Sequence, residues 1–212
     1  MGPEVRPGRP PVAAVDVAAG DTSEQQRIDA SGSTTLRWRQ VSIIECDVVL
    51  PDIAAVEFDG GRLIDSVVPD PAVDEWAAAD STWRNTRVTG GRIGSLTLAR
   101  ARLDGVALSQ TRIGYLDLRG AGTTGLTVAG CRIDTLDVTD ARITRATFRE
   151  CQIGEIMTHH AQLDEFDLRG AQLGRIEGAS GLRGTTIDSG QLLALAPLLA
   201  EALGVTVTDD PE

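Results

Sequence analysis

The sequence has no lysine, only two histidines and three cysteines, and aromatic residues make up 3% of its 212 residues. Without a following lysine, the glycine-rich fragment at residues 120–125 does not match a phosphate-binding loop. His159 and His160 are adjacent, and neighbouring side chains in an extended chain point apart. Catalytic signals are therefore almost absent, and we expect no cofactor and no metal site, even with Met157 and Cys151 nearby.

The chain also lacks a long uninterrupted apolar run. The longest one, from Leu192 to Leu203, is broken by Pro197 and Glu201 and is too short to span a bilayer. No basic start followed by an apolar stretch is present, which argues against a secretory signal. We expect a soluble, cytoplasmic protein.

The sequence does contain a strict five-residue period of apolar residues. It runs from Trp38 to Val68 and again from Trp83 to Leu173 in one phase, which matches neither a helix nor a plain strand. The residue two positions earlier is also small or apolar, as in Ala101 with Leu103. Two inward residues separated by an outward one indicate a short strand, and the polar residues between such pairs indicate corners. The period therefore predicts a stack of short repeats.

Segments such as Ala101–Gly105 and Ala146–Glu150 resemble the motif of the pentapeptide-repeat family: a small residue, a polar residue, a central apolar residue and two polar or small residues. The resemblance covers roughly residues 36–187. It implies an all-β solenoid, namely a right-handed quadrilateral parallel β-helix with four pentapeptides per coil. Residues twenty apart would then stack.

The chain looks like a divergent family member, because the first inward residue alternates between small and large. This alternation predicts a true period of ten and a rectangular cross-section. Thr123, Thr158 and Gly178 interrupt the row of large apolar centres, so we expect weaker packing at these positions.

We divide the chain into three regions. Residues 1–35, rich in proline, alanine and glycine, are expected to be an N-terminal tail or linker, although Ile28 could begin a first irregular coil. Residues 36–187 are expected to form the repeat β-helix, with an extruded loop at 69–80 because Pro69 and Pro71 cannot donate ladder hydrogen bonds. Trp76 in that loop is either a plug that folds back on the coil or an exposed anchor for a partner.

Residues 188–212 are expected to form a C-terminal helical cap and tail. Leucines recur there at largely helical spacing behind a capping Asp188 or Ser189. Such a helix would cover the open edge of the last coil. A homodimer contact is the alternative, since some pentapeptide-repeat proteins associate through their C-terminal ends. The residues concerned are Leu192, Leu195, Leu198, Leu199 and Leu203.

The net charge of −11 is distributed unevenly. Residues 91–180 contain eleven arginines and eleven acidic residues, so the regular rod is neutral and the acidic surplus lies towards the two ends. Stacking would align Arg92, Arg112 and Arg132 in one column, with Asp117 and Asp137 on the next face. The candidate partner-binding residues are Asp47, Asp52, Glu57, Asp59, Asp65, Asp74, Glu75 and Trp76.

Three functions remain open at this point. The first is a non-enzymatic scaffold that presents a rigid rod to a protein partner. The second follows from the resemblance, because the family includes DNA-mimicking proteins that bind DNA gyrase, a type II topoisomerase, and protect it from quinolones. The third is an enzyme or metal protein built on the coil. Direct nucleic-acid binding and membrane binding are not expected.

Cys131 and Cys151 would stack closely enough for a disulfide, but we expect free thiols, as for Cys46.

Overall fold

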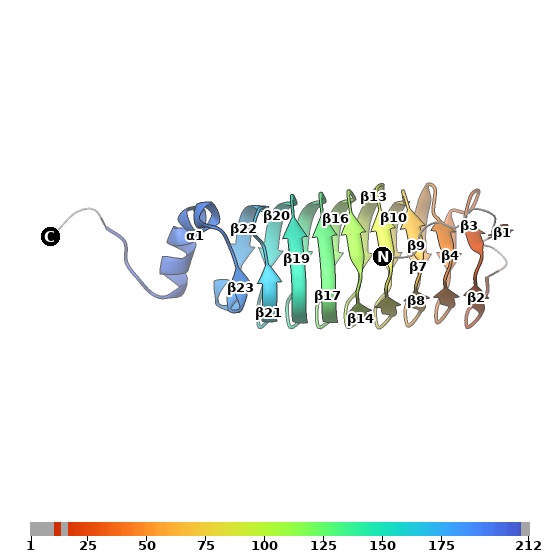
Figure 1. Cartoon of the computed structure of the whole chain (residues 1–212), viewed down its shortest axis with the longest axis horizontal. Helices are drawn as coiled ribbons and strands as arrows, with labels where there is room; N and C mark the ends of the chain where they lie inside the picture. Colours follow the sequence, from red (N-terminus) through yellow and green to blue (C-terminus); the bar gives the residue numbers. More distant parts are fainter. Residues whose placement is uncertain (1–10, 14–16, 209–212) are drawn as a thin grey trace.

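The computed structural model describes residues 11–13 and 17–208. Short parallel strands stack side by side along one long axis, with a single α-helix at the C-terminal end (Figure 1). One sheet of eight strands contributes one strand to each turn, so the rod has about eight turns. The predicted parallel β-solenoid with a C-terminal helix is confirmed.

The eight-stranded sheet consists of β4 (Thr35–Arg37), β7 (Ile53–Glu57), β10 (Ala72–Ala77), β13 (Arg92–Thr97), β16 (Arg112–Asp117), β18 (Arg132–Asp137), β20 (Gln152–Met157) and β22 (Gln172–Glu177). Each strand pairs with the strand twenty residues away, as Ile93 with Ile113 and Ile113 with Ile133. These isoleucines are buried, so the stacking of residues twenty apart holds as predicted.

The second sheet covers two further columns of the coil. Its first column contains β2 (Thr22–Glu24), β5 (Ser42–Ile44), β8 (Arg62–Ile64), β11 (Thr82–Arg84) and β14 (Arg102–Asp104). Its second contains β1 (Pro11–Ala13), β3 (Arg27–Asp29), β6 (Asp47–Val49), β9 (Val67–Pro69), β12 (Arg87–Thr89) and β15 (Ala107–Ser109). The strands β17 (Gly122–Ala129), β19 (Arg142–Arg149) and β21 (Gln162–Asp167) run through both columns, and β23 (Thr185–Thr186) extends the second.

The inward side chains form one continuous apolar core along the axis. Large and small residues are both present in this core. Gly61 lies against the Phe58 ring, and a Cβ atom at position 61 would be 2.7 Å from that ring. Trp76 and Trp83 share one level of the core with ring centroids 5.3 Å apart, beside the small residues Ala78 and Ser81.

The two exceptional threonines behave differently. The Thr158 hydroxyl donates to backbone oxygens of the next turn, at 2.7 Å from Gly178 O, so its burial is compensated. The Thr123 hydroxyl is buried and has no hydrogen-bond partner among the described residues, so its burial is not compensated.

The expected loop at 69–80 is wrong. β10 lies inside the eight-stranded sheet and pairs in register with both β7 and β13. Pro71 does not interrupt the ladder, because the flanking Asp70 N–H donates to Thr89 O at 2.7 Å and Ala72 N–H donates to Leu50 O at 2.8 Å. Prolines at positions whose N–H groups are not needed are compatible with a strand edge or corner.

The expected N-terminal tail is also partly wrong. Residues 22–37 already form strands β2, β3 and β4 of a first turn, and Ile28 is fully buried in the core. β1 continues this end of the sheet by pairing with β3. The rest of the predicted tail, residues 1–10 and 14–16, lies outside the described residues.

At the C-terminal end, the 3₁₀ helix η2 (Ala179–Leu182) leaves the coil and α1 (Ser189–Ala202) follows. Asp188 caps α1 in a reciprocal capping box with Gln191. The Gln191 side-chain amide also donates to Leu168 O and Ala171 O, both at 2.7 Å. The start of the helix is therefore tied to the last turn of the solenoid.

The core position of Trp76 gives a stability prediction. Trp76→Ala should lower the free energy of unfolding by about 3–5 kcal/mol, because a cavity replaces the largest side-chain type. Trp76→Phe is the matched control: it keeps an aromatic ring and removes an indole N–H that has no hydrogen-bond partner among the described residues, so its cost should stay below about 1.5 kcal/mol. Urea unfolding followed by far-UV circular dichroism measures both. An unchanged urea midpoint for Trp76→Ala would contradict the conclusion that the Trp76 side chain fills the core.

Candidate protein-binding surface

The acidic residues predicted to bind a partner do not form one patch. Asp52, Asp74 and Glu75 lie on the eight-stranded sheet or at its edge, whereas Asp47 and Asp65 belong to the other sheet or its corners. Asp47 is buried, with only 7% of its surface exposed. The stacking that brings residues twenty apart together also separates acids that are close in sequence onto different faces.

Several of these acids already have partners within the chain. Glu57 forms an ion pair with Arg39 at 3.0 Å, and the Asp59 side chain accepts the Ala79 N–H at 3.0 Å. Asp65 accepts the Asn85 amide at 2.9 Å. These contacts join neighbouring turns, so the carboxylates help to hold the stack.

Trp76 cannot be an exposed anchor. Its side chain points into the core, and only 2% of the residue is exposed. The plug alternative agrees with this burial, although Trp76 fills a regular strand position and not a loop.

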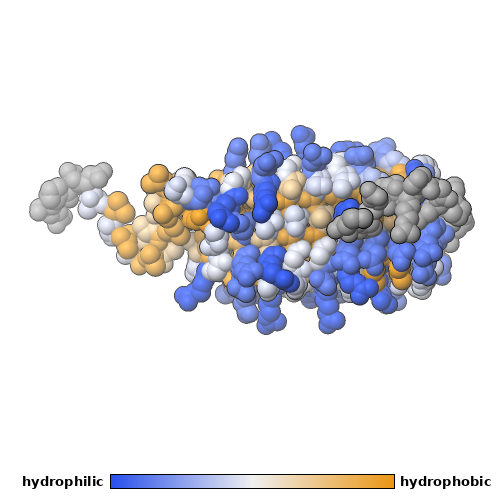
Figure 2. Space-filling view, in the orientation of Figure 1, coloured by the Kyte–Doolittle hydropathy of each residue, from blue (hydrophilic) through white to orange (hydrophobic). Residues whose placement is uncertain are grey.

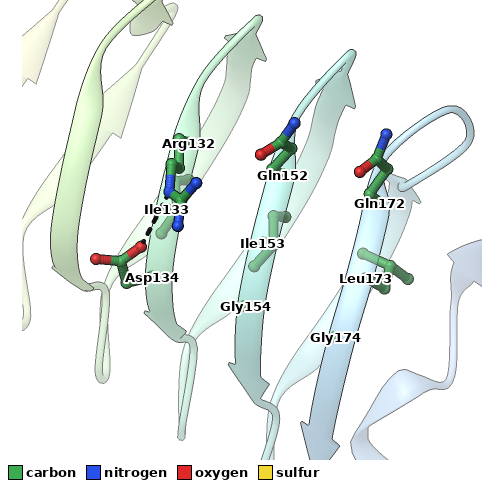
Figure 3. A pocket seen from close by; sticks show the side chains of 9 residues that line it. All are labelled: Arg132, Ile133, Asp134, Gln152, Ile153, Gly154, Gln172, Leu173 and Gly174. Atoms are coloured by element: carbon green, nitrogen blue, oxygen red, sulfur yellow. Dashed lines mark hydrogen bonds and ion pairs between the residues drawn. The ribbon is translucent and has the colours of Figure 1, made fainter.

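A more coherent surface lies on the eight-stranded sheet. We define the arginine column as Arg92, Arg112 and Arg132, which are direct neighbours on β13, β16 and β18. The same column continues with Gln152 and Gln172. Figure 3 shows Arg132, Gln152 and Gln172 at the same height on three adjacent strands, above the inward-pointing Ile133 and Ile153.

Beside the arginine column lies a glycine-rich floor, two residues further along each strand. We define it as Gly94, Gly114, Asp134, Gly154 and Gly174. Glycine is favoured here because a Cβ atom at 94 or 114 would be 2.4 Å from the carbonyl oxygen of the preceding turn. The missing side chains leave a shallow hollow of about 290 Å³ lined by residues from β18, β20 and β22 (Figure 3).

The charges of the arginine column are compensated at its ends only. Arg92 contacts Asp74 at 3.1 Å and Asp52 at 3.6 Å, and Arg132 contacts Asp134 at 3.4 Å. All these side chains are more than half exposed. Among the described residues, the guanidinium of Arg112 has no ion-pair or hydrogen-bond partner.

The adjacent face carries a compact charged cluster in which two carboxylates stack. Asp117 and Asp137 are register neighbours, and their side chains are 1% and 5% exposed. Arg119 binds Asp117 through two hydrogen bonds of 3.0 and 2.7 Å and lies 3.7 Å from Asp137. The Tyr115 hydroxyl donates to Asp137 at 2.9 Å. The predicted aspartate column is therefore present, but it is shielded from solvent by its own partners.

The C-terminal helix presents apolar side chains to solvent. Leu195 is buried on α1, which contacts η2, whereas Leu192, Leu193 and Leu203 are 50%, 78% and 80% exposed. Leu198 and Leu199 are partly buried. Figure 2 shows apolar surface gathered at this end of the molecule. The five predicted leucines therefore divide between contact with the rod and exposed surface.

Other reactive side chains do not assemble into a site in the described part of the chain. Among residues 11–13 and 17–208, no group of three or more histidine, cysteine or acidic side chains is placed to hold a metal ion. Cys46, Cys131 and Cys151 are buried free thiols, as predicted. No α-helix in this part is long and apolar enough to cross a membrane.

Each turn of the solenoid contains twenty residues, divided into five-residue units that each place a pair of residues inward. The chain is a parallel β-solenoid built from five-residue units. No family model matches the sequence, and no curated protein matches it.

Solved structures similar to the solenoid include pentapeptide-repeat proteins. A trypsin-treated variant of QnrB1, a plasmid-mediated fluoroquinolone resistance protein, is 17% identical with a TM-score of 0.43, and the match covers 93% of this chain and 98% of that one. HetL, a pentapeptide repeat protein involved in heterocyst differentiation regulation in the cyanobacterium Nostoc sp. strain PCC 7120, is 14% identical with a TM-score of 0.30, covering 85% and 88%. At these low scores the likeness extends no further than the fold class.

Sequence reasoning found the arginine column but not the glycine-rich floor beside it. The signal was present in the spacing, because the glycines at 94, 114, 154 and 174 are also separated by multiples of twenty. The burial of Asp117 and Asp137 was not predictable from spacing, because it depends on how the Arg119 and Tyr115 side chains fold over them.

The single tyrosine of the chain gives a direct test of the charged cluster. Burial, the hydrogen bond to Asp137 and the negative charge of that carboxylate raise the pKa of Tyr115 to about 12. Ultraviolet titration should show ionisation near that pH in the folded chain, and Asp137→Asn should move it towards 10. Because the folded pKa is the higher one, this contribution to stability is complete below pH 10 and is lost as the pH rises towards 12. Ionisation near pH 10 in the folded chain would contradict the cluster.

Proposed function

We propose that this solenoid is a non-enzymatic scaffold that binds a protein partner along the arginine face, defined as the arginine column together with the glycine-rich floor. The observation that carries the proposal is the alignment of exposed side chains in straight columns over several turns of a regular sheet. A surface of this kind offers repeated contacts in fixed positions.

The shape of the face supports protein binding over small-molecule binding. Pockets for small ligands are usually enclosed and mainly apolar, with a few convergent polar groups. The hollow on the arginine face is shallow and open to solvent, so it would leave much of a small ligand uncovered. Arginine is also one of the residue types enriched in protein interfaces.

The C-terminal helix supports a second contact, between two copies of the chain. Leu192, Leu193 and Leu203 expose apolar surface beyond what the last turn can cover. Large exposed apolar patches often mark association sites. In this proposal α1 both covers the end of the rod through Leu195 and joins two rods through its outer leucines.

The alternative is an acidic protein that imitates DNA and binds a type II topoisomerase. The net charge of −11 favours it. The arrangement of the acids favours it less, because a phosphate mimic needs like charges in an open row. Here Glu57, Asp80 and Asp167 each contact an arginine, at 3.0, 2.6 and 2.8 Å.

Affinity capture from the native cell extract, followed by cross-linking and mass spectrometry, tests the scaffold proposal. Cross-links from a captured protein should map to residues 92–95, 112–115 and 132–135, and a captured protein linked elsewhere would contradict the assigned face. For the alternative, purified chain is added to gyrase supercoiling reactions with and without a quinolone. No effect on either reaction removes that alternative.

The proposed role of α1 gives a separate prediction. Leu193→Asp should shift the chain from dimer to monomer in size-exclusion chromatography with light scattering and leave the far-UV circular dichroism spectrum unchanged, because Leu193 is exposed in the single chain. Leu195→Asp should lower the midpoint, because it places a charge without a partner in a buried position. If the unmodified chain is a monomer at every concentration, the dimer proposal is wrong.

A further inference from the structure

We propose that the arginine column binds an acidic α-helix of the partner protein, lying along the axis of the rod. This inference rests on the scaffold function proposed above and specifies the chemistry of the partner. It starts from Arg112, the middle arginine of the column, which has no carboxylate partner among the described residues.

The arginine column places three like charges one above the other. Adjacent parallel strands are about 4.8 Å apart, so neighbouring guanidinium groups repel each other. Some other arginines pair with acids, as in Arg100 with Asp80 and Arg175 with Glu155. Arg102, which has no carboxylate partner among the described residues, has Thr82 and Gly122 as register neighbours and no arginine. Arg112 has no such partner in residues 11–13 and 17–208, although it lies between two other arginines. Carboxylates supplied by another chain would relieve this repulsion.

The spacing of the column selects the form of the acidic partner. From Arg92 to Arg132 the column spans two strand spacings, or about 9.6 Å. Carboxylates at positions i, i+4 and i+7 of an α-helix span about 10.5 Å along its axis. Alternate side chains of an extended strand span about 13 Å over the same three contacts. The helix therefore keeps all three carboxylates opposite the three arginines, whereas the strand falls out of register.

The glycine-rich floor allows a helix to approach. Gly94 and Gly114 have no side chains and lie directly beside the arginine column, so a helix about 10–12 Å wide can rest against backbone there. Tyr115 does not block the approach, because its hydroxyl is held by Asp137 on the neighbouring face. The column would supply charge contacts along one side of the helix.

The existing ion pairs of the column do not prevent such binding. Arg132 is 59% exposed and Asp134 61% exposed, and exposed ion pairs contribute only about 0–1 kcal/mol. An incoming carboxylate can replace Asp134 at little cost. The overall negative charge of the chain opposes approach only weakly, because charges are screened beyond about 8 Å at physiological salt.

A defined peptide tests the inference on the full chain. The probe is a fluorescently labelled, helix-stabilised peptide with glutamates at i, i+4 and i+7, compared with a peptide of equal composition whose glutamates are spread around the helix. Fluorescence anisotropy should show tighter binding of the first peptide, and the affinity should fall as salt is raised. Arg112→Glu should weaken binding at least about tenfold, a loss of about 1.4 kcal/mol.

Arg102→Glu is the matched control. Arg102 has the same outward repeat position on β14 in the other sheet, so this variant makes the same charge change away from the arginine face. It should leave binding within about twofold of the unmodified chain, and circular dichroism checks that both variants fold.

Several outcomes would overturn the inference: no binding by the unmodified chain, equal binding of the two peptides, or equal loss in both variants. Tighter binding of a single-stranded oligonucleotide than of the aligned peptide would assign the column to phosphates. Cross-linking of a captured protein to the arginine face would still support the scaffold function in any of these cases, so the two proposals can fail separately.

Discussion

The ladder of backbone hydrogen bonds between successive turns governs the rest of this structure. Each turn contains twenty residues, and bonds such as Arg102 N–H to Ser81 O and Gly122 N–H to Ala101 O, both 2.9 Å, recur along the rod. A single turn cannot bury a core, so stability comes from interfaces between neighbours. The same ladder fixes the outward side chains in columns, and any binding surface must therefore be built from residues twenty apart.

Periodicity predicted the fold well because every fifth residue points inward and residues twenty apart stack on each other. Ile93, Ile113 and Ile133 occupy the same inward position in three successive turns, and each is essentially buried. The periodicity also held at Pro69 and Pro71, and the loop expected there from residue type was wrong. Proline removes one donor only, and the ladder around Pro71 continues through Asp70 and Ala72. Phase was the more reliable signal than local composition.

The binding surface was less predictable because it depends on side-chain contacts between turns. Counting acids along the sequence placed Asp47, Glu57 and Asp74 in one region, but the coil distributes them over different faces. Glu57 and Asp74 are also engaged by arginines. The arginine column was predictable because identical residues at a spacing of twenty must stack. Only the geometry reveals that Arg112, unlike Arg92 and Arg132, has no carboxylate partner among the described residues.

The fixed length of the turn restricts how such a chain can change during evolution. Duplication or loss of twenty residues lengthens or shortens the rod by one turn and keeps every column of stacked side chains intact. Insertion of five residues turns all later side chains by one face, so an arginine such as Arg132 would move around the corner from Arg112. Variation in length among descendants of this sequence should therefore occur in whole turns.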